Sequence, residues 1–446
     1  MKILFVSLGC DKNLVDSEKM LGLLGKKGHT FTNEETEAEA IIINTCCFIN
    51  DAKEESVNTI LEMAEYKKSG LCKALIVTGC MAQRYQEDIM EEIPEVDGVL
   101  GTAAWEEISV ILERVEQGEN RIQCFRDLTT LPKGDFQRMM TTGGHYAFLK
   151  IGEGCDKHCT YCIIPSLRGP YRSIPMEQLL EEAGQLASQG VKELILVAQE
   201  TTVYGVDLYG EKRLPRLLRE LCRIPGIQWI RLLYCYPEEI TGELIQVIKE
   251  EEKICHYLDM PIQHCSDRIL RHMGRRTSQN QLREIISRLR SEIPDIVLRT
   301  TLISGFPGET KEDHEELMDF VEDMAFERLG VFAYSPEEDT PAASFEGQLP
   351  EEIREERRDA IMELQQDIAF EHCKSMTGVL LEVMIEGKVS DEPVYVGRTY
   401  MDAPDVDGLI FVDSEEELIS GDFVRVKVTG AYEYDLIGEV CDESAE

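Results

Sequence analysis

The sequence predicts an α/β protein in three parts: an N-terminal doubly wound parallel sheet, a central incomplete (β/α)6 barrel of the TIM type, and a small five-stranded β-barrel at the C-terminus. In the first two parts, short β-branched apolar runs alternate with amphipathic helices. Such runs are typical of parallel strands covered on both faces. After residue 375 short strands follow one another without helices, which is typical of oligonucleotide-binding barrels.

The first part covers residues 1–120 and contains four strands and four helices. The expected strands are 2–8, 40–44, 73–79 and 96–101, and the expected helices are 13–26, 50–67, 81–91 and 104–117. Residues 121–145 are polar and end in TTGGH. We therefore predict a linker there.

The second part covers residues 146–374 and repeats the strand–helix alternation six times. The expected strands are 146–152, 193–199, 228–235, 256–260, 295–303 and 327–335, with helices that include 176–188, 239–250 and 278–291, and a long charged helix at 350–374. In barrels of this kind the chemistry lies at the C-terminal ends of the strands. The third part, 375–446, holds the strands TGVLLEVMIEG, PVYVGRT, DGLIFV, DFVRVKVTGA and DLIGEV.

Composition excludes several classes of protein. With 43% hydrophobic and 29% charged residues the chain reads as globular, and no apolar run reaches the ~18–20 residues that span a bilayer. The N-terminal MKILFVSLGCDKN reads as a first strand rather than a signal peptide, so we expect a cytoplasmic protein without membrane contact. The 15 cysteines are an odd number, which favours metal or redox chemistry over a disulfide framework.

Three cysteines lie close together directly after the first strand of the second part. In GEGCDKHCTYCIIP, Cys155, Cys159 and Cys162 have the spacing C-x3-C-x2-C. Three thiolates can hold a [4Fe–4S] cube and leave one iron open to a small molecule. A zinc site is the alternative, but structural zinc takes four ligands, commonly in paired C-x2-C units.

This loop resembles the signature of the radical S-adenosylmethionine superfamily. The resemblance implies that the open iron binds S-adenosylmethionine and that an external electron donor supplies the electron that cleaves it to a 5′-deoxyadenosyl radical. Tyr161 would then lie near the adenine. Gln199 and Glu200 in AQET, and Gly305 and Gly308 in GFPGET, are further candidate cofactor contacts. Each of these could instead belong to an ordinary loop or turn.

A second set of cysteines is scattered along the first part. Cys10, Cys46 and Cys80 each follow a predicted strand, in SLGCDKN, NTCCFI and TGCMAQR. Because the C-terminal ends of parallel strands meet at one edge of a sheet, these three could hold a second cluster. Buried structural cysteines are the alternative, and Cys47 competes with Cys46 for the middle position.

The two triads and the terminal barrel together resemble the methylthiotransferases, over essentially the whole chain. The matching segments are SLGCxKNxVDSE, NTCxFI, TGCxAQRY, the central loop, MPIQH and GFPGET. The resemblance implies two [4Fe–4S] clusters, a TRAM-like terminal barrel, and S-adenosylmethionine as both methyl donor and radical source. The N-terminal cluster would carry the sulfur, and the central cluster would make the radical that activates a C–H bond.

Charge discriminates between the two substrate classes of that family. The net charge of the chain is −39. Residues 379–446 hold 18 carboxylates and four basic residues, a net charge of −14. The basic residues are Lys388, Arg398, Arg425 and Lys427. Such a surface repels a phosphate backbone and attracts a basic protein. Of the two substrates that the resemblance implies, this charge favours an aspartate of ribosomal protein S-12, free or in the small subunit, which that branch of the family modifies at the β-carbon; we expect no direct RNA binding. Methylthiolation of adenosine in tRNA is the alternative.

The segment GRTYMDAPDVDG (397–408) also resembles the ribosomal-protein branch. In this interpretation its polar residues face the substrate: Tyr400, Asp402, Asp405 and Asp407. A solvated acidic loop is the alternative. A non-enzymatic iron–sulfur scaffold or RNA-binding module is disfavoured, because a carrier does not need a six-stranded barrel around an open iron.

Overall fold

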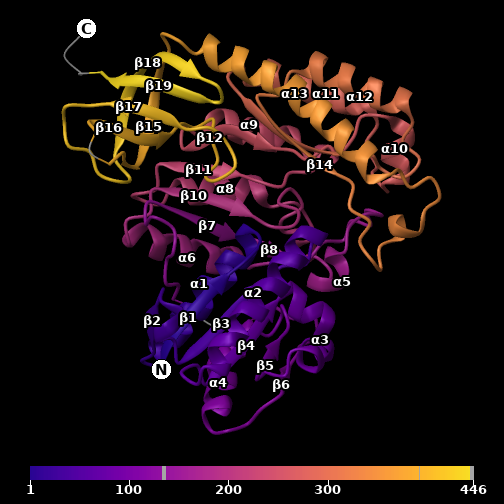
Figure 1. Cartoon of the computed structure of the whole chain (residues 1–446). Coiled ribbons are helices and arrows are strands. Elements are labelled where there is room, and N and C mark those ends of the chain that lie inside the picture. The colour runs from indigo at the N-terminus through magenta and orange to yellow at the C-terminus, as the bar shows by residue number, and fades with distance from the viewer. Residues whose placement is uncertain (133–136, 391, 442–446) are drawn as a thin grey trace. The chain divides into compact units, whose positions relative to one another are not determined.

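The computed structural model describes residues 1–132, 137–390 and 392–441 (Figure 1). The chain forms two compact units. Unit 1 comprises Met1–Thr141, Gly152–Ile174 and Glu337–Thr340, and unit 2 comprises Thr142–Ile151, Pro175–Pro336 and Pro341–Glu446. The loop that carries the central cysteines therefore belongs to unit 1. Among the described residues, no helix combines the length and apolar character that crossing a membrane requires.

Unit 1 is built on a six-stranded parallel sheet, ordered β2-β1-β3-β4-β5-β6. Its strands are β1 Lys2–Ser7, β2 Thr30–Thr32, β3 Ala40–Thr45, β4 Ala74–Gly79, β5 Gly98–Leu100 and β6 Ile122–Cys124, and its main helices are α1 Asp11–Lys26, α2 Asn50–Lys68, α3 Cys80–Glu92 and α4 Ile108–Glu116. Separate apolar cores cover the two faces. The predicted doubly wound sheet is confirmed.

Two short strands of unit 1 differ from the expectation. The edge strands β2 and β6 were not predicted, and β6 lies within the segment expected to be a linker. Residues 133–136 of that segment lie outside the described residues. Three-residue edge strands carry little apolar signal, because their pairing comes from the neighbouring strand rather than from their own periodicity.

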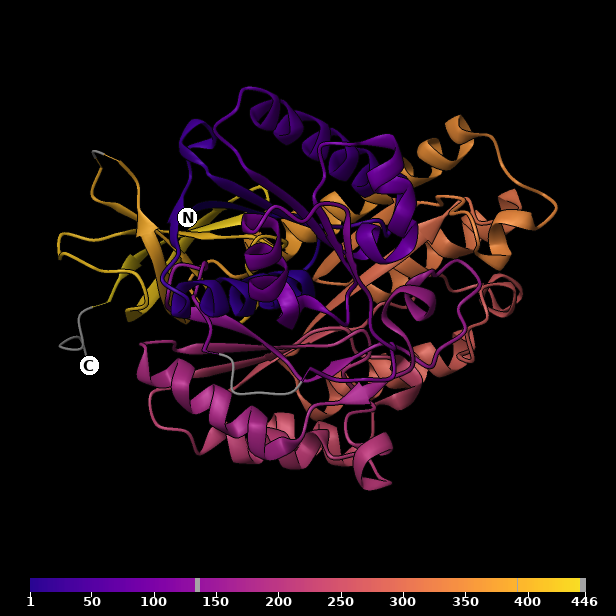
Figure 2. The ribbon, with the colours of Figure 1, turned by 90° about the horizontal axis from the view of Figure 1, so that it is seen from below.

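Unit 2 contains the predicted six parallel strands, each beside the one before it in the chain. They are β7 Tyr146–Lys150, β10 Glu193–Val197, β11 Trp229–Leu232, β12 Ile254–Asp259, β13 Val297–Ser304 and β14 Arg328–Ala333, and the main helices are α6 Met176–Ser188, α8 Leu214–Cys222, α9 Gly242–Glu250, α11 Gln279–Glu292, α12 Lys311–Met324 and α13 Glu351–Ser375. The sheet stays open between β14 and β7, which confirms an incomplete barrel. Helix α13, orange in Figure 2, packs against β13, β14 and α12.

The C-terminal strands of unit 2 close into the expected five-stranded barrel, ordered β15-β16-β17-β19-β18. They are β15 Leu380–Lys388, β16 Val394–Arg398, β17 Ile410–Asp413, β18 Phe423–Tyr432 and β19 Asp435–Val440 (yellow in Figure 1). Trp229 of β11 packs edge-on against Phe423, with ring centroids 4.8 Å apart. Residues 391 and 442–446 of the expected barrel region lie outside the described residues.

Buried charges join the barrel to the parallel sheet inside unit 2. The fully buried carboxylate of Glu193 lies between two buried arginines, 2.7 Å from Arg231 Nε and 2.7 Å from Arg398 Nη2. Arg398 also contacts Glu386 at 2.6 Å. Each arginine covers an aromatic ring as well, Arg231 that of Tyr257 and Arg398 that of Tyr146. Replacing any one of these charged residues would leave an uncompensated buried charge, so these ion pairs fix the barrel to the sheet.

Candidate functional site

The scattered cysteines come together at one edge of the sheet in unit 1. Cys10 precedes α1 directly after β1, Cys46 follows β3, and Cys80 begins α3 directly after β4. Strands β1, β3 and β4 are neighbours, and Thr45 pairs with Gly79. A Cβ built on Gly9 (φ +92°) would lie 3.1 Å from Cys46 Sγ, so the β1 turn touches that thiol. The structure therefore brings the three positions to one place.

The electrostatics agree with this convergence. Burial raises the pKa of the Cys46 thiol to about 12, and the neighbouring Cys80 and Cys10 raise it further. Cys47, the competing position, is fully buried within the apolar core of the sheet. Its neighbour Cys46 instead lies against the β1 turn that leads to Cys10, and this contact makes Cys46 the better candidate ligand.

The central cysteines occupy a loop closed by a short hairpin, β8 Gly152–Glu153 with β9 Arg172–Ser173. The amide of Cys155 donates to the Gly169 carbonyl at 3.1 Å, and the amide of Cys162 donates to the Cys159 carbonyl at 3.1 Å. Burial raises the pKa of Cys162 to about 12, and the nearby Cys159 and Cys155 thiols add to this. These contacts gather the three sulfurs of the loop.

The donor chemistry of both triads suits an iron–sulfur cluster. None of these six described cysteines forms a disulfide. In the described part of the chain, no three His, Cys, Asp or Glu side chains converge on a point where a single metal ion could bind. A [4Fe–4S] cube takes one thiolate at each iron that the protein ligates, so its ligands need not converge on a single point. Burial raises the pKa of the Cys46, Cys80 and Cys162 thiols, and binding of iron would release their protons.

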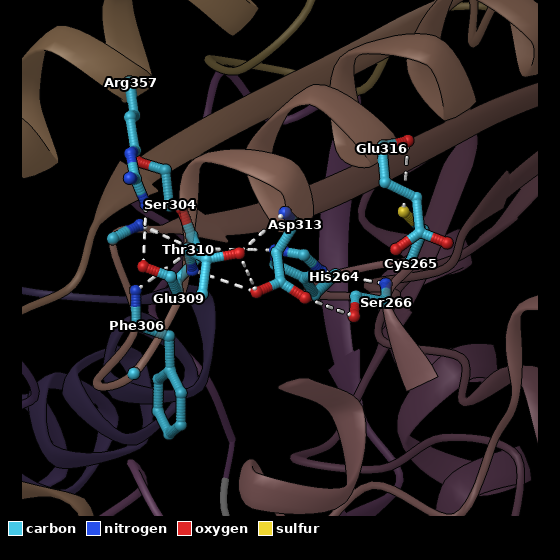
Figure 3. Close-up of polar contacts among 12 residues, drawn as sticks. His264, Cys265, Ser266, Ser304, Phe306, Glu309, Thr310, Asp313, Glu316 and Arg357 are labelled. Carbon is cyan, nitrogen blue, oxygen red and sulfur yellow. Dashed lines mark hydrogen bonds and ion pairs between the residues drawn. The ribbon is translucent and has the colours of Figure 1, made fainter. Parts of the chain in front are cut away.

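The GFPGET turn lies at the end of β13 in unit 2 (Figure 3). Gly305 and Gly308 both have left-handed backbone angles, φ +70° and φ +80°. The carboxylate of Glu309 accepts the amide protons of Gly305 at 2.8 Å and Phe306 at 3.2 Å. A carboxylate inside the turn thus presets the glycine backbone at the strand end, where a cofactor can approach closely.

Glu309 is itself held from two sides. Arg357 of α13 donates to its Oε1 at 2.6 Å, and Nε2 of the fully buried His264 lies 3.5 Å from its Oε2. Burial raises the pKa of Glu309, but His264 and Arg357 outweigh this, and the net pKa is lowered. His264 is the last residue of the MPIQH segment, and the sequence alone did not predict a role for any residue of that segment. Its Nδ1 accepts the Ser266 amide at 3.0 Å, which leaves the Nε2 proton for Glu309.

The remaining candidate cofactor contacts lie in different units: Gln199 and Glu200 in unit 2, and Tyr161 in unit 1. Gln199 and Glu200 follow β10, at the same C-terminal edge of the unit 2 sheet as the GFPGET turn. Glu200 is buried and accepts a hydrogen bond from the Thr202 hydroxyl at 2.5 Å. Tyr161 is half-buried in the cysteine loop of unit 1. Their roles toward S-adenosylmethionine stay predictions.

In the acidic loop after β16, two of the expected substrate contacts are buried in ion pairs or hydrogen bonds. Asp402 is buried and pairs with Arg328 at 2.6 Å. Asp407 accepts the Tyr257 hydroxyl at 2.6 Å and lies 3.4 Å from Arg299.

The tyrosine of this loop also forms a hydrogen bond within unit 2. The Tyr400 hydroxyl donates to the Asp295 carbonyl at 3.0 Å. Asp402 and Asp407 therefore pair within unit 2 instead of facing a substrate. The sequence could not reveal this, because the arginine partners lie far away along the chain. Tyr400 is half-buried and Asp405 is exposed, and their contact with a substrate stays a prediction.

Comparison with known proteins places the chain in a family. Residues 2–101 match the uncharacterized protein family UPF0004, residues 149–321 the radical SAM superfamily, and residues 377–441 the TRAM domain. The radical SAM match implies a [4Fe–4S] cluster and S-adenosylmethionine.

Among solved structures, the radical S-adenosylmethionine methyltransferase TsrM from Kitasatospora setae has a TM-score of 0.57 at 14% identity, covering 85% of this chain and 80% of that one. This likeness concerns the fold alone.

Relatives match along the full length. The chain is 64% identical to the ribosomal protein uS12 methylthiotransferase RimO of Lachnoclostridium phytofermentans, covering 98% of this chain and 99% of the relative. It is 51% identical to the RimO of Acetivibrio thermocellus, covering 100% and 99%, and 50% identical to that of Clostridioides difficile, covering 100% of both. The methylthiotransferase resemblance is thereby confirmed, and the chain belongs to the RimO family of radical S-adenosylmethionine methylthiotransferases.

Proposed function

We propose that this chain transfers a methylthio group to the β-carbon of an aspartate in ribosomal protein uS12. The placement within unit 1 of two cysteine triads that form no disulfide carries the proposal, and the identity to full-length RimO relatives supports it. When bound, two [4Fe–4S] clusters and S-adenosylmethionine supply the radical, the sulfur and the methyl group, with electrons from an external donor.

The protein's own residues supply position. Cys155, Cys159 and Cys162 would hold the central cluster, and Cys10, Cys46 and Cys80 the second. The GFPGET turn, preset by Glu309, would present its glycine backbone to S-adenosylmethionine. Gly305 must be glycine here, because a Cβ would collide with Arg354. Burial of Cys46, Cys80, Cys155 and Cys159 would limit the access of water to the clusters and to a reactive radical.

The barrel's charge favours a basic protein substrate over RNA. Of its four basic residues, Arg398 is fully buried in ion pairs with Glu193 and Glu386 and is not available to a phosphate. The loop between β17 and β18 exposes three consecutive carboxylates, Glu415, Glu416 and Glu417. Long-range attraction to a basic partner would speed encounter, and it would weaken as salt is added.

Anaerobic reaction of the reconstituted enzyme with dithionite, S-adenosylmethionine and uS12 tests the proposal. We expect 5′-deoxyadenosine and a methylthio mass on one uS12 aspartate. Serine at any central cysteine should abolish both products, whereas serine at Cys10, Cys46 or Cys80 should spare 5′-deoxyadenosine and stop methylthiolation. Cys47→Ser is the matched control, since that thiol lies beside Cys46 but faces the core.

Two outcomes would contradict the proposal. Absence of 5′-deoxyadenosine from the wild-type enzyme would exclude radical chemistry. Loss of a methylthio mass from tRNA nucleosides, with unchanged uS12, in a deletion strain would assign the substrate to the RNA class.

A further inference from the structure

A buried arginine connects the two cysteine triads of unit 1. Arg168 is the last residue of α5, Ile164–Arg168, six positions after Cys162 in the central loop. Its side chain is only 2% exposed. An arginine so deeply buried keeps its charge only when fixed partners surround it.

Two of its three partners come from helix α1, and the third comes from the hairpin of its own loop. Arg168 Nη1 lies 3.0 Å from Asp16 Oδ2 of α1 and 3.2 Å from Glu153 Oε2. Its Nη2 donates to the side-chain oxygen of Asn13, which also lies on α1. Asn13 Nδ2 in turn donates to the carbonyl oxygens of Leu8 and Thr45, each 3.0 Å away, in the turns that lead to Cys10 and Cys46. The guanidinium thus joins the central loop to the turns of the scattered triad.

The guanidinium also places a buried positive charge beside the scattered triad. Its donors reach the carboxylates of Asp16 and Glu153 and the side-chain oxygen of Asn13. Burial opposes the charge of Arg168, but its negative neighbours outweigh this, and its pKa is raised overall. A planar fork of donors can serve these three oxygens at once, which a lysine cannot reproduce.

We infer that Arg168 is a positioning residue for sulfur transfer: it ties the central cysteine loop to the sheet edge of the scattered triad and holds a buried positive charge beside the turns that lead to Cys10 and Cys46. The inference rests on the proposed function in that the scattered triad holds the second cluster. A buried cation beside a cluster stabilises the reduced, more negative cluster, and so raises its reduction potential. A residue that only braces the fold would leave that potential unchanged.

Reduction potentials of the full-length two-cluster protein, measured by titration followed by electron paramagnetic resonance, test the inference. The signals are assigned with the Cys155→Ser, Cys159→Ser, Cys162→Ser protein, which keeps only the second cluster. Arg168→Gln should reduce the ratio of reduced to oxidised second cluster at least tenfold at fixed potential, a shift of about 59 mV to more negative values for one electron. Arg168→Lys, which keeps the charge, should recover part of this shift.

Two further variants separate electrostatics from folding. Asp16→Asn removes a negative neighbour of Arg168 and should shift the same potential in the opposite direction, to more positive values. Arg138→Gln is the matched control, because Arg138 is an equally buried arginine paired with Glu18 of α1. It should leave the potential unchanged.

The inference would be overturned if Arg168→Gln and Asp16→Asn shift the potential in the same direction or not at all, or if Arg138→Gln shifts it equally. If Arg168→Gln fails to fold, the sign of the Asp16→Asn shift still decides. These potentials are measured without uS12. The inference about Arg168 can therefore fail while methylthiolation is observed, and methylthiolation can be absent while the predicted shifts are found.

Discussion

Glu193 provides the sharpest test of how unit 2 is held together. Glu193→Ala removes the only carboxylate that lies between Arg231 and Arg398 in the described contacts, and both arginines are fully buried. The loss of one partner from a buried ion pair costs about 3–5 kcal/mol. Arg398 keeps Glu386, whereas Arg231 keeps only carbonyl and aromatic partners. We therefore expect a loss of unfolding free energy of about 4 kcal/mol.

Urea unfolding followed by Trp229 fluorescence measures this loss. Trp229 packs on Phe423 at the same junction, and Trp105→Phe removes the other tryptophan of the chain. Glu220→Ala is the matched control, because Glu220 pairs with Arg223 on an exposed helix surface and should cost no more than about 1 kcal/mol. A loss below about 1 kcal/mol for Glu193→Ala, or equal losses for the two variants, would refute the reasoning.

Three further predictions concern carboxylates of unit 2. Burial raises the pKa of Glu193, but Arg398 and Arg231 outweigh this, and the net pKa lies below 4.5. The ionised carboxylate therefore contributes its full stabilisation above pH 4.5 and loses it as the pH falls through the folded-state pKa. The difference in unfolding free energy between the wild type and Glu193→Gln should narrow only in acid. Glu309→Gln removes the charge that Arg357 pairs with and should weaken S-adenosylmethionine binding roughly tenfold by calorimetry; unchanged affinity would contradict the role of the turn. Asp402→Asn should lower the melting temperature without changing the KM for uS12, because Asp402 pairs with Arg328.

Much of the fold followed from the sequence because its signals are local. The runs AIIIN and ALIV are buried on both faces, so their composition alone reports a central parallel strand. The meeting of Cys10, Cys46 and Cys80 was also predictable, since parallel strands end at one edge. The buried roles of Asp402 and Arg168 were not, because their partners lie far away along the chain and a charged residue in a loop ordinarily indicates solvent.

The most direct test of the two-triad scheme is to measure 5′-deoxyadenosine and the mass of uS12 in the same reaction with the Cys80→Ser enzyme. We expect 5′-deoxyadenosine to form while uS12 keeps its unmodified mass, and Cys47→Ser to behave as the wild type. Methylthiolated uS12 from the Cys80→Ser enzyme would contradict the assignment of a second cluster to the edge of the N-terminal sheet.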